Sequence, residues 1–197
     1  MLTHTKVLGG NPTYKVLYRE IKFPRLEFKS GNLEVILPKG HRIEPEEVVE
    51  RHKNWIRRRQ LFIRDALKGS SSKSLHIERT VEDFKDLVRR IIERHTHRLR
   101  VSPRGIYFRP MRTKWASCSN KNNITFNTKL RLLPLSTIDY VVYHELIHLV
   151  NRKHDTRFWN TMRKRYRNTD TWEKRLLSYW FLIHRNRNRK GHLIAIH

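Results

Sequence analysis

The segment His144-Glu145-Leu146-Ile147-His148 combines the residue types and the spacing of a metal-dependent hydrolytic site. Two histidines four positions apart share one face of a helix, so His144 and His148 can both bind one Zn²⁺. Glu145 lies beside His144, where its carboxylate can act as general base on a zinc-activated water without binding the metal. Two unrelated surface histidines are the alternative, but apolar residues flank the motif on both sides, as in a buried helix.

A third ligand is expected, because catalytic zinc usually has three protein ligands and one open position. His154 follows His148 by six residues, after the polar stretch 151–153 where the motif's helix should end. A turn at this stretch would return His154 to the metal. Glu173 is the alternative third ligand, and His184 is a more distant one, so the residue pattern alone leaves the choice open.

The elements that must position these residues alternate between helix and strand patterns. The motif lies in a predicted helix from about Ser136 to Asn151. Apolar spacing and turn residues predict two short strands, at 106–108 and 124–127, and further helices at about 80–97, 155–167 and 171–184. This order predicts an α+β fold, in which the active-site helix packs against a small mixed or antiparallel sheet.

The first part of the chain has a different pattern. Residues 14–38 alternate like strands of an antiparallel meander or hairpin, with a turn at 30–32, and Pro45 opens a helix with one basic face. A Gly/Ser-rich stretch follows. We therefore predict a β-rich N-terminal lobe with its basic helix at 1–68, a linker at 69–75, a catalytic domain at 76–184 and a basic tail at 185–197.

Charge is the strongest bulk feature of the 197-residue chain. It has 43 Lys and Arg against 18 Asp and Glu, a net charge of +25, which attracts polyanions such as DNA or an anionic membrane surface. A merely solvated basic surface is the alternative. The single cysteine, Cys118, allows no internal disulfide, and the chain has neither a signal-like start nor a long apolar run, which together favour a cytoplasmic setting.

Four segments together resemble the YgjP-like metallopeptidase family, which is related to the SprT-like and WLM-type peptidases. The segments are residues 115–119 (Trp-Ala-Ser-Cys-Ser), 124–127, 138–148 and 154–159. The resemblance covers about residues 110–165 in detail, although family members commonly carry glycine where this chain has Ala116. It implies a zincin-like fold, with His144, His148 and His154 as zinc ligands and Glu145 as general base, and it favours His154 over Glu173.

The related peptidases cleave proteins attached to DNA, so the resemblance and the charge together suggest a protein substrate near or bound to DNA. The alternative function is a basic nucleic-acid-binding protein with a structural or degenerate zinc site, and a third reading is a zinc hydrolase of non-peptide amides. A structural zinc site normally has four protein ligands, whereas three histidines and a glutamate placed as a base favour the peptidase.

Further expectations concern the substrate and the transition state. Trp115, Ile124 and Phe126 are the expected substrate-binding residues, with residues 124–130 as an edge strand that pairs with an extended peptide; an ordinary sheet strand is the alternative. Cys118 is either a metal-blocking thiolate or a packed turn residue. The candidates for stabilising the oxyanion are Tyr143, Tyr166 and Arg112, and their spacing does not choose among them.

Overall fold

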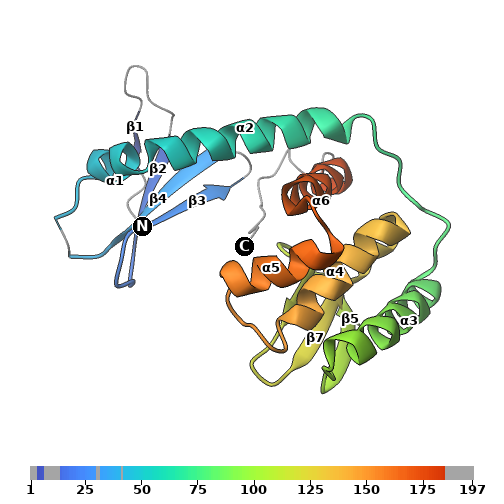
Figure 1. The fold of residues 1–197 in the computed structure, drawn as a ribbon. Coiled ribbons are helices and arrows are strands. Elements are labelled where there is room, and N and C mark those ends of the chain that lie inside the picture. Colours follow the sequence, from blue (N-terminus) through green and yellow to red (C-terminus); the bar gives the residue numbers. More distant parts are fainter. Residues whose placement is uncertain (1–3, 7–13, 30–31, 41, 185–197) are drawn as a thin grey trace. The chain divides into compact units, whose positions relative to one another are not determined.

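The computed structural model describes residues 4–6, 14–29, 32–40 and 42–184 (Figure 1). These residues form two compact units, one ending at Asp65 and one from Ala66 to His184. The division falls inside helix α2 (Lys53–Ser70), which continues through the first two residues of the predicted linker. The predicted functional domains therefore stay a prediction, and the basic tail lies outside the described residues. Among the described residues, no helix is long and apolar enough to span a bilayer.

The N-terminal unit contains a four-stranded sheet of order β1-β2-β4-β3. Its strands are β1 (His4–Lys6), β2 (Tyr14–Arg19), β3 (Arg25–Lys29) and β4 (Asn32–Pro38). The predicted hairpin is confirmed for β3 and β4, which pair antiparallel, but the predicted meander is wrong because β2 pairs with β4 in parallel. The physical reason is burial. Leu33, Val35 and Leu37 of β4 are at most 1% exposed, so β4 takes an interior position between β2 and β3.

Two helices follow this sheet. The single helix predicted from Pro45 is divided at His52 into α1 (Pro45–Arg51) and α2. Val48, Val49 and Ile56 pack into the core of the sheet.

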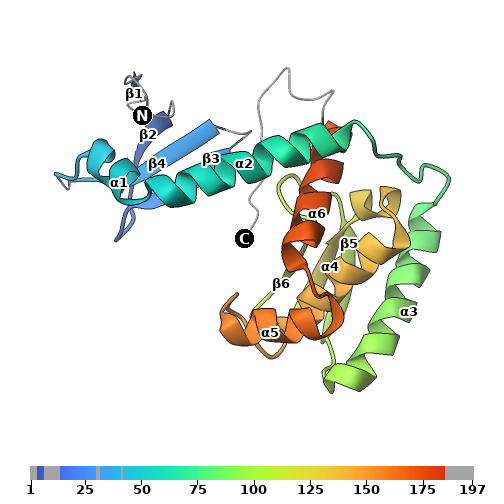
Figure 2. The same cartoon turned by 45° about the horizontal axis from the view of Figure 1, so that its top comes forward.

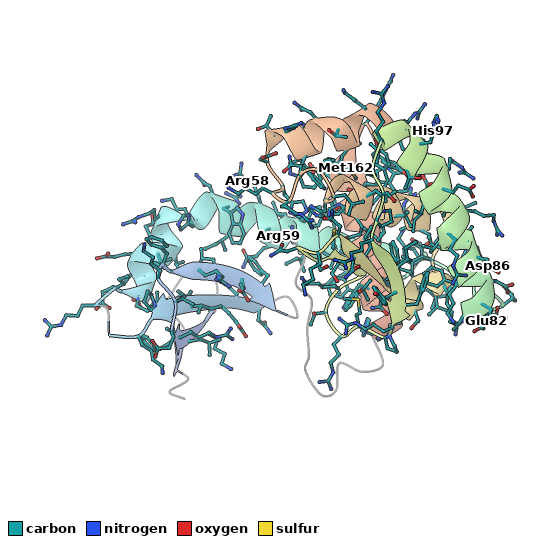
Figure 3. The ribbon with its side chains drawn as sticks, turned by 90° about the horizontal axis from the view of Figure 1, so that it is seen from below. Arg58, Arg59, Glu82, Asp86, His97 and Met162 are labelled. Carbon is teal, nitrogen blue, oxygen red and sulfur yellow. The ribbon has the colours of Figure 1, made fainter. Side chains whose placement is uncertain are left out.

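The second unit begins with the end of α2 and helix α3 (Val81–Leu99). Helix α3 begins with a capping box, because the Thr80 hydroxyl accepts from the backbone N–H of Asp83 and the Asp83 carboxylate accepts from the backbone N–H of Thr80. One side of α3 packs into the core, while Glu82, Asp86 and His97 lie along its exposed side (Figure 3).

A three-stranded mixed sheet lies beside these helices, with β5 (Gly105–Arg109), β6 (Ala116–Cys118) and β7 (Asn123–Asn127) in the order β5-β7-β6. Strand β7 pairs in parallel with β5 and antiparallel with β6. The predicted edge strand is therefore wrong: β7 is central, because its residues Ile124 and Phe126 are fully buried, and β6, which the sequence pattern missed, is at the edge.

A short 3₁₀ helix η1 (Thr128–Leu132) leads from this sheet to three helices, α4 (Leu135–Ile147), α5 (Thr156–Arg165) and α6 (Thr169–His184). Figure 2 shows α4 beside the sheet, with α3, α5 and α6 around it. Nearly every residue of α4 is buried. The predicted α+β class, with an active-site helix against a small mixed sheet after a β-rich N-terminal region, is confirmed.

Candidate metal centre

Three imidazole nitrogens converge at the end of α4. The Nε2 atom of His154 lies 2.9 Å from Nε2 of His144 and 3.0 Å from Nε2 of His148. One ligand atom from each histidine falls within 4.8 Å of the others, so these three residues form a group that could hold a metal ion. The structure thus brings together the three residues singled out as ligands.

The turn between the helix and His154 makes this convergence possible. Helix α4 ends at Ile147, four residues before the predicted end, but His148 keeps a right-handed helical backbone (φ −63°, ψ −16°) and stays on the face of His144. Residues 149–153, here called the ligand turn, then tighten, since the N–H groups of Leu149 and Val150 bond to carbonyls three residues earlier. This turn sends the chain back toward the end of the helix.

Asn151 in the ligand turn orients two parts of the centre. Its carbonyl oxygen lies 2.9 Å from Nδ1 of His148, so that Nδ1–H donates and the Nε2 lone pair faces the other histidines. Its side-chain Nδ2 donates to Oδ1 of Asp155 at 2.8 Å, and this carboxylate caps α5 by accepting from the N–H of Phe158. The residue that fixes one imidazole therefore also fixes the start of α5.

Phe158 forms the apolar base of the centre. Its side chain is fully buried, and its ring centroid lies 4.8 Å from those of His144 and His148 and 4.6 Å from that of His154. The indole N–H of Trp159 donates to the carbonyl of His154 at 3.1 Å. These contacts hold the third imidazole against the first two.

Glu145 is buried beside this cluster, and its Oε2 has no hydrogen-bond partner. Burial raises the pKa of Glu145 to about 8, against the opposing effect of the Lys114 charge. An unpartnered buried carboxylate costs free energy and is typical of a functional site. Three imidazoles, one with a fixed tautomer, and a carboxylate outside the ligand group fit the donor set of a catalytic zinc site.

The alternative ligands have other partners. The hydroxyl of Tyr140 donates to Oε1 of Glu173 at 2.7 Å. His184 lies with Nδ1 2.9 Å from the carbonyl of Trp180 and Nε2 2.7 Å from Nζ of Lys129. Neither Glu173 nor His184 belongs to the histidine group.

The predicted substrate-binding residues are dispersed. Ile124 and Phe126 lie in the core, so their side chains cannot contact a substrate and this part of the prediction is wrong. Trp115 is partly buried, with its ring 4.9 Å from that of Trp180 in a T-shaped contact, and its role stays a prediction.

Cys118 lies on β6 and does not belong to the metal-ligand group. Its Sγ is 3.2 Å from Nη1 of Arg152, and burial raises the pKa of its thiol.

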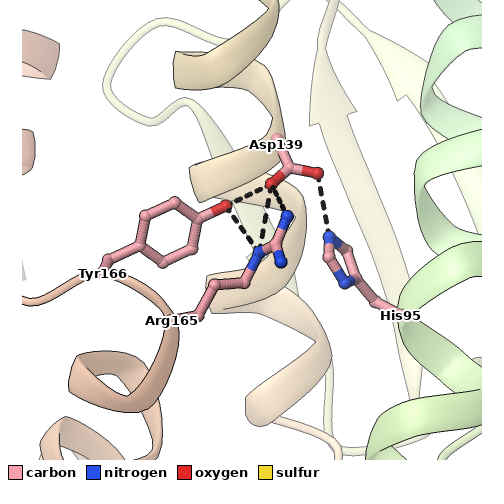
Figure 4. Close-up of polar contacts among 4 residues, drawn as sticks. All are labelled: His95, Asp139, Arg165 and Tyr166. Atoms are coloured by element: carbon pink, nitrogen blue, oxygen red, sulfur yellow. Dashed lines mark hydrogen bonds and ion pairs between the residues drawn. The ribbon is translucent and has the colours of Figure 1, made fainter.

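A buried polar cluster, which the sequence pattern missed, joins helices α3, α4 and α5 (Figure 4). Asp139 of α4 lies with Oδ1 2.8 Å from Nε2 of His95 on α3, and its Oδ2 accepts from Nη2 of Arg165 at 2.8 Å and from the hydroxyl of Tyr166. Tyr166 therefore donates to Asp139 instead of toward the metal centre. The one available signal was His95, which continues the apolar face of Ile91 and Ile92.

The comparison with protein families points to a metallopeptidase. Residues 70–179 match the YgjP-like metallopeptidase domain family. The search of curated proteins gives no match. Two similar solved structures are metallopeptidase zymogens. Abylysin of Pyrococcus abyssi is 22% identical over 47% of this chain and 93% of its own (TM-score 0.43). Jannalysin of Methanocaldococcus jannaschii is 28% identical over 48% of this chain and 91% of its own (TM-score 0.39). Because the family match spans more than half of the sequence, this chain belongs to the YgjP-like metallopeptidase family.

Proposed function

We propose that this metallopeptidase hydrolyses peptide bonds with a zinc ion held by His144, His148 and His154, and with Glu145 as general base. The observation that carries the proposal is the convergence of three Nε2 atoms, together with a buried, unpartnered carboxylate oxygen on Glu145, the residue after His144. A closed structural site would have a fourth protein ligand, and the group of potential ligands contains only these three among the described residues.

The chemistry divides between the metal and the chain. The three histidines would hold a zinc ion, which would supply Lewis acidity toward the scissile carbonyl and the attacking water. Glu145 takes a proton from the attacking water while the water oxygen bonds to the carbonyl carbon. Glu145 then returns this proton to the amine nitrogen as the C–N bond breaks. The Asn151 carbonyl keeps Nδ1 of His148 protonated, so that Nε2 stays available throughout.

The edge strand β6 is the proposed place for the substrate backbone. Its residues Ala116–Cys118 pair with β7 on one side, and no strand pairs with the other side among the described residues. An extended peptide can add to such an edge through main-chain hydrogen bonds. This replaces the predicted role of the strand at 124–130, which is central.

The test of the proposal is zinc content together with cleavage. The purified chain is expected to hold one zinc per molecule and to cleave casein, and chelation should abolish cleavage until zinc is restored. A protein without stoichiometric zinc would refute the catalytic proposal.

His154 can be tested as the third ligand with a matched control. His154→Ala is expected to bind zinc at least about tenfold more weakly, since even outer partners of a ligand contribute about 10–100-fold. His97→Ala, on the exposed side of α3, should bind zinc like the wild type (Figure 3). Equal zinc affinities for both variants, measured by competition with a chromogenic chelator, would remove His154 from the ligand set.

A second proposal concerns the setting, because the net charge is +25. We propose that the peptidase acts on proteins near or bound to DNA, which it approaches by sequence-independent attraction to phosphates. The affinity for double-stranded DNA is then expected to fall steeply with salt, linearly in a log–log plot. Lack of binding at low salt, or a flat salt dependence, would leave only a solvated basic surface.

A further inference from the structure

Six basic residues flank the edge strand in the sequence or lie in the ligand turn and the start of α5, and we call them the cationic rim. They come from the segment before β6, the turn after it, the ligand turn and the first turn of α5: Arg112, Lys114, Lys121, Arg152, Lys153 and Arg157. Five are exposed and Lys114 is partly so. The segment before β6 is held against β7, since Nδ2 of Asn127 donates to the carbonyls of Met111 and Lys114.

Contacts place members of the rim at both ends of β6. Arg152 lies at the C-terminal end, where its Nη1 is 2.7 Å from the carbonyl oxygen of Ser119 and its Nη2 bonds to the side chain of Asn122. Lys114 lies two residues before the N-terminal end, where its carbonyl accepts from Nδ2 of Asn127 at 2.7 Å. A peptide paired with β6 would therefore pass between two cations.

Few acidic residues lie among these cations in the sequence, and one of them, Asp155, interacts electrostatically with Arg157. Between Arg112 and Arg167 the sequence contains three acidic residues, Asp139, Glu145 and Asp155. Asp139 is buried in its own cluster, Glu145 is buried next to His144 in the chain, and Asp155 caps α5. No member of the rim forms an ion pair with a carboxylate in the part of the chain that the structure describes.

We propose that the cationic rim makes this site select extended acidic peptides, with carboxylate side chains at both ends of the stretch that pairs with β6. The inference rests on the proposed function of the site. Lys114 and Ser119 are five residues apart, and a strand rises about 3.3 Å per residue, so the two carboxylates should lie about five residues apart. A strand edge matches a peptide backbone and not a phosphodiester backbone, which favours an acidic peptide over a nucleic acid.

The experiment compares three fluorogenic peptides with one core sequence and Glu, Gln or Lys at the two flanking positions. At low salt, kcat/KM is expected to fall in the order Glu, Gln, Lys, with roughly a tenfold or larger span. The span should shrink as salt screens the charges. Lys121 lies in the turn that Arg152 contacts, and Lys153 follows Arg152 in the chain, so the double variant Lys121→Glu/Lys153→Glu reverses the charge around Arg152 and should remove or invert the order. The matched variant Arg90→Glu/Arg94→Glu, on the exposed side of α3, should keep it.

A second readout separates this inference from the proposed function. Fluorescence anisotropy of the labelled peptides with the Glu145→Gln protein reports binding without hydrolysis, so a preference for the acidic peptide would support the inference even if no peptide is cleaved. Equal binding and cleavage of the three peptides would overturn it, as would the same change in both double variants. If single-stranded DNA binds through Lys121 and Lys153 while the peptides bind alike, the rim is instead a nucleic-acid surface.

Discussion

Glu145→Gln is expected to lower kcat for peptide hydrolysis by about 10²–10⁴-fold, the usual contribution of a general base, without loss of zinc. The amide has the shape of the carboxylate but cannot accept the proton of the attacking water. The fold should tolerate the change, because the replaced carboxylate is buried and its Oε2 lacks a partner, so that a neutral amide costs less to bury. The measurement is steady-state cleavage of a fluorogenic peptide together with metal analysis of both proteins.

Glu173→Gln is the matched control for this prediction. Glu173 accepts a hydrogen bond from the hydroxyl of Tyr140, and the side-chain oxygen of a glutamine can accept the same hydrogen bond. Its kcat should therefore stay close to that of the wild type. If Glu145→Gln retains wild-type kcat, or if Glu173→Gln loses as much activity, Glu145 is not the general base.

Asp139→Ala is expected to lower the free energy of unfolding by about 3 kcal/mol, the low end of the range for breaking a buried ion pair. The low end applies because the Arg165 side chain is 29% exposed, so that water can partly replace its lost bond to Asp139. His95 has no such access, since it is 1% exposed, and would lose the carboxylate that faces its Nε2. Urea denaturation measures the loss, with Asp86→Asn as control, because the Asp86–Arg89 pair is exposed.

The Asp139 carboxylate should also make the free energy of unfolding depend on pH. Burial opposes its ionisation, but the bonds from His95, Tyr166 and Arg165 outweigh burial and hold the pKa of Asp139 well below its ordinary value. A carboxyl with a lowered folded pKa contributes stability above its unfolded pKa of about 3.9 and loses it as the pH falls through the folded pKa. The stability difference between wild type and Asp139→Ala should therefore shrink below about pH 4; a difference that grows in acid would contradict this assignment.

The local features of the centre were predictable, because they lie close together in sequence. The histidine spacing places His144 and His148 on one face, and the polar stretch after them predicts a turn before His154. The end of the helix was predicted four residues too late, since the chain leaves α4 through short-range bonds that residue types do not specify.

The features that depend on long-range pairing were not predictable. The parallel pairing of β2 with β4 follows from the burial of β4, which a hairpin pattern does not reveal. Strand β6 has three residues, too few to show alternation. The bond between His95 and Asp139 joins positions 44 residues apart, and nothing in their neighbourhoods pairs them.

The short strand β6 also bears on self-association. An exposed strand edge is a template for pairing with another copy of the same chain, and proteins limit this hazard by shortening edge strands and placing lysines at them. β6 has three residues, with Lys114 two positions before it and Lys121 three positions after it. Edge-to-edge pairing of two copies would bring like charges together over a very short ladder. The edge of β6 can therefore accept a substrate peptide while its short length and flanking lysines disfavour pairing with a second copy of the chain.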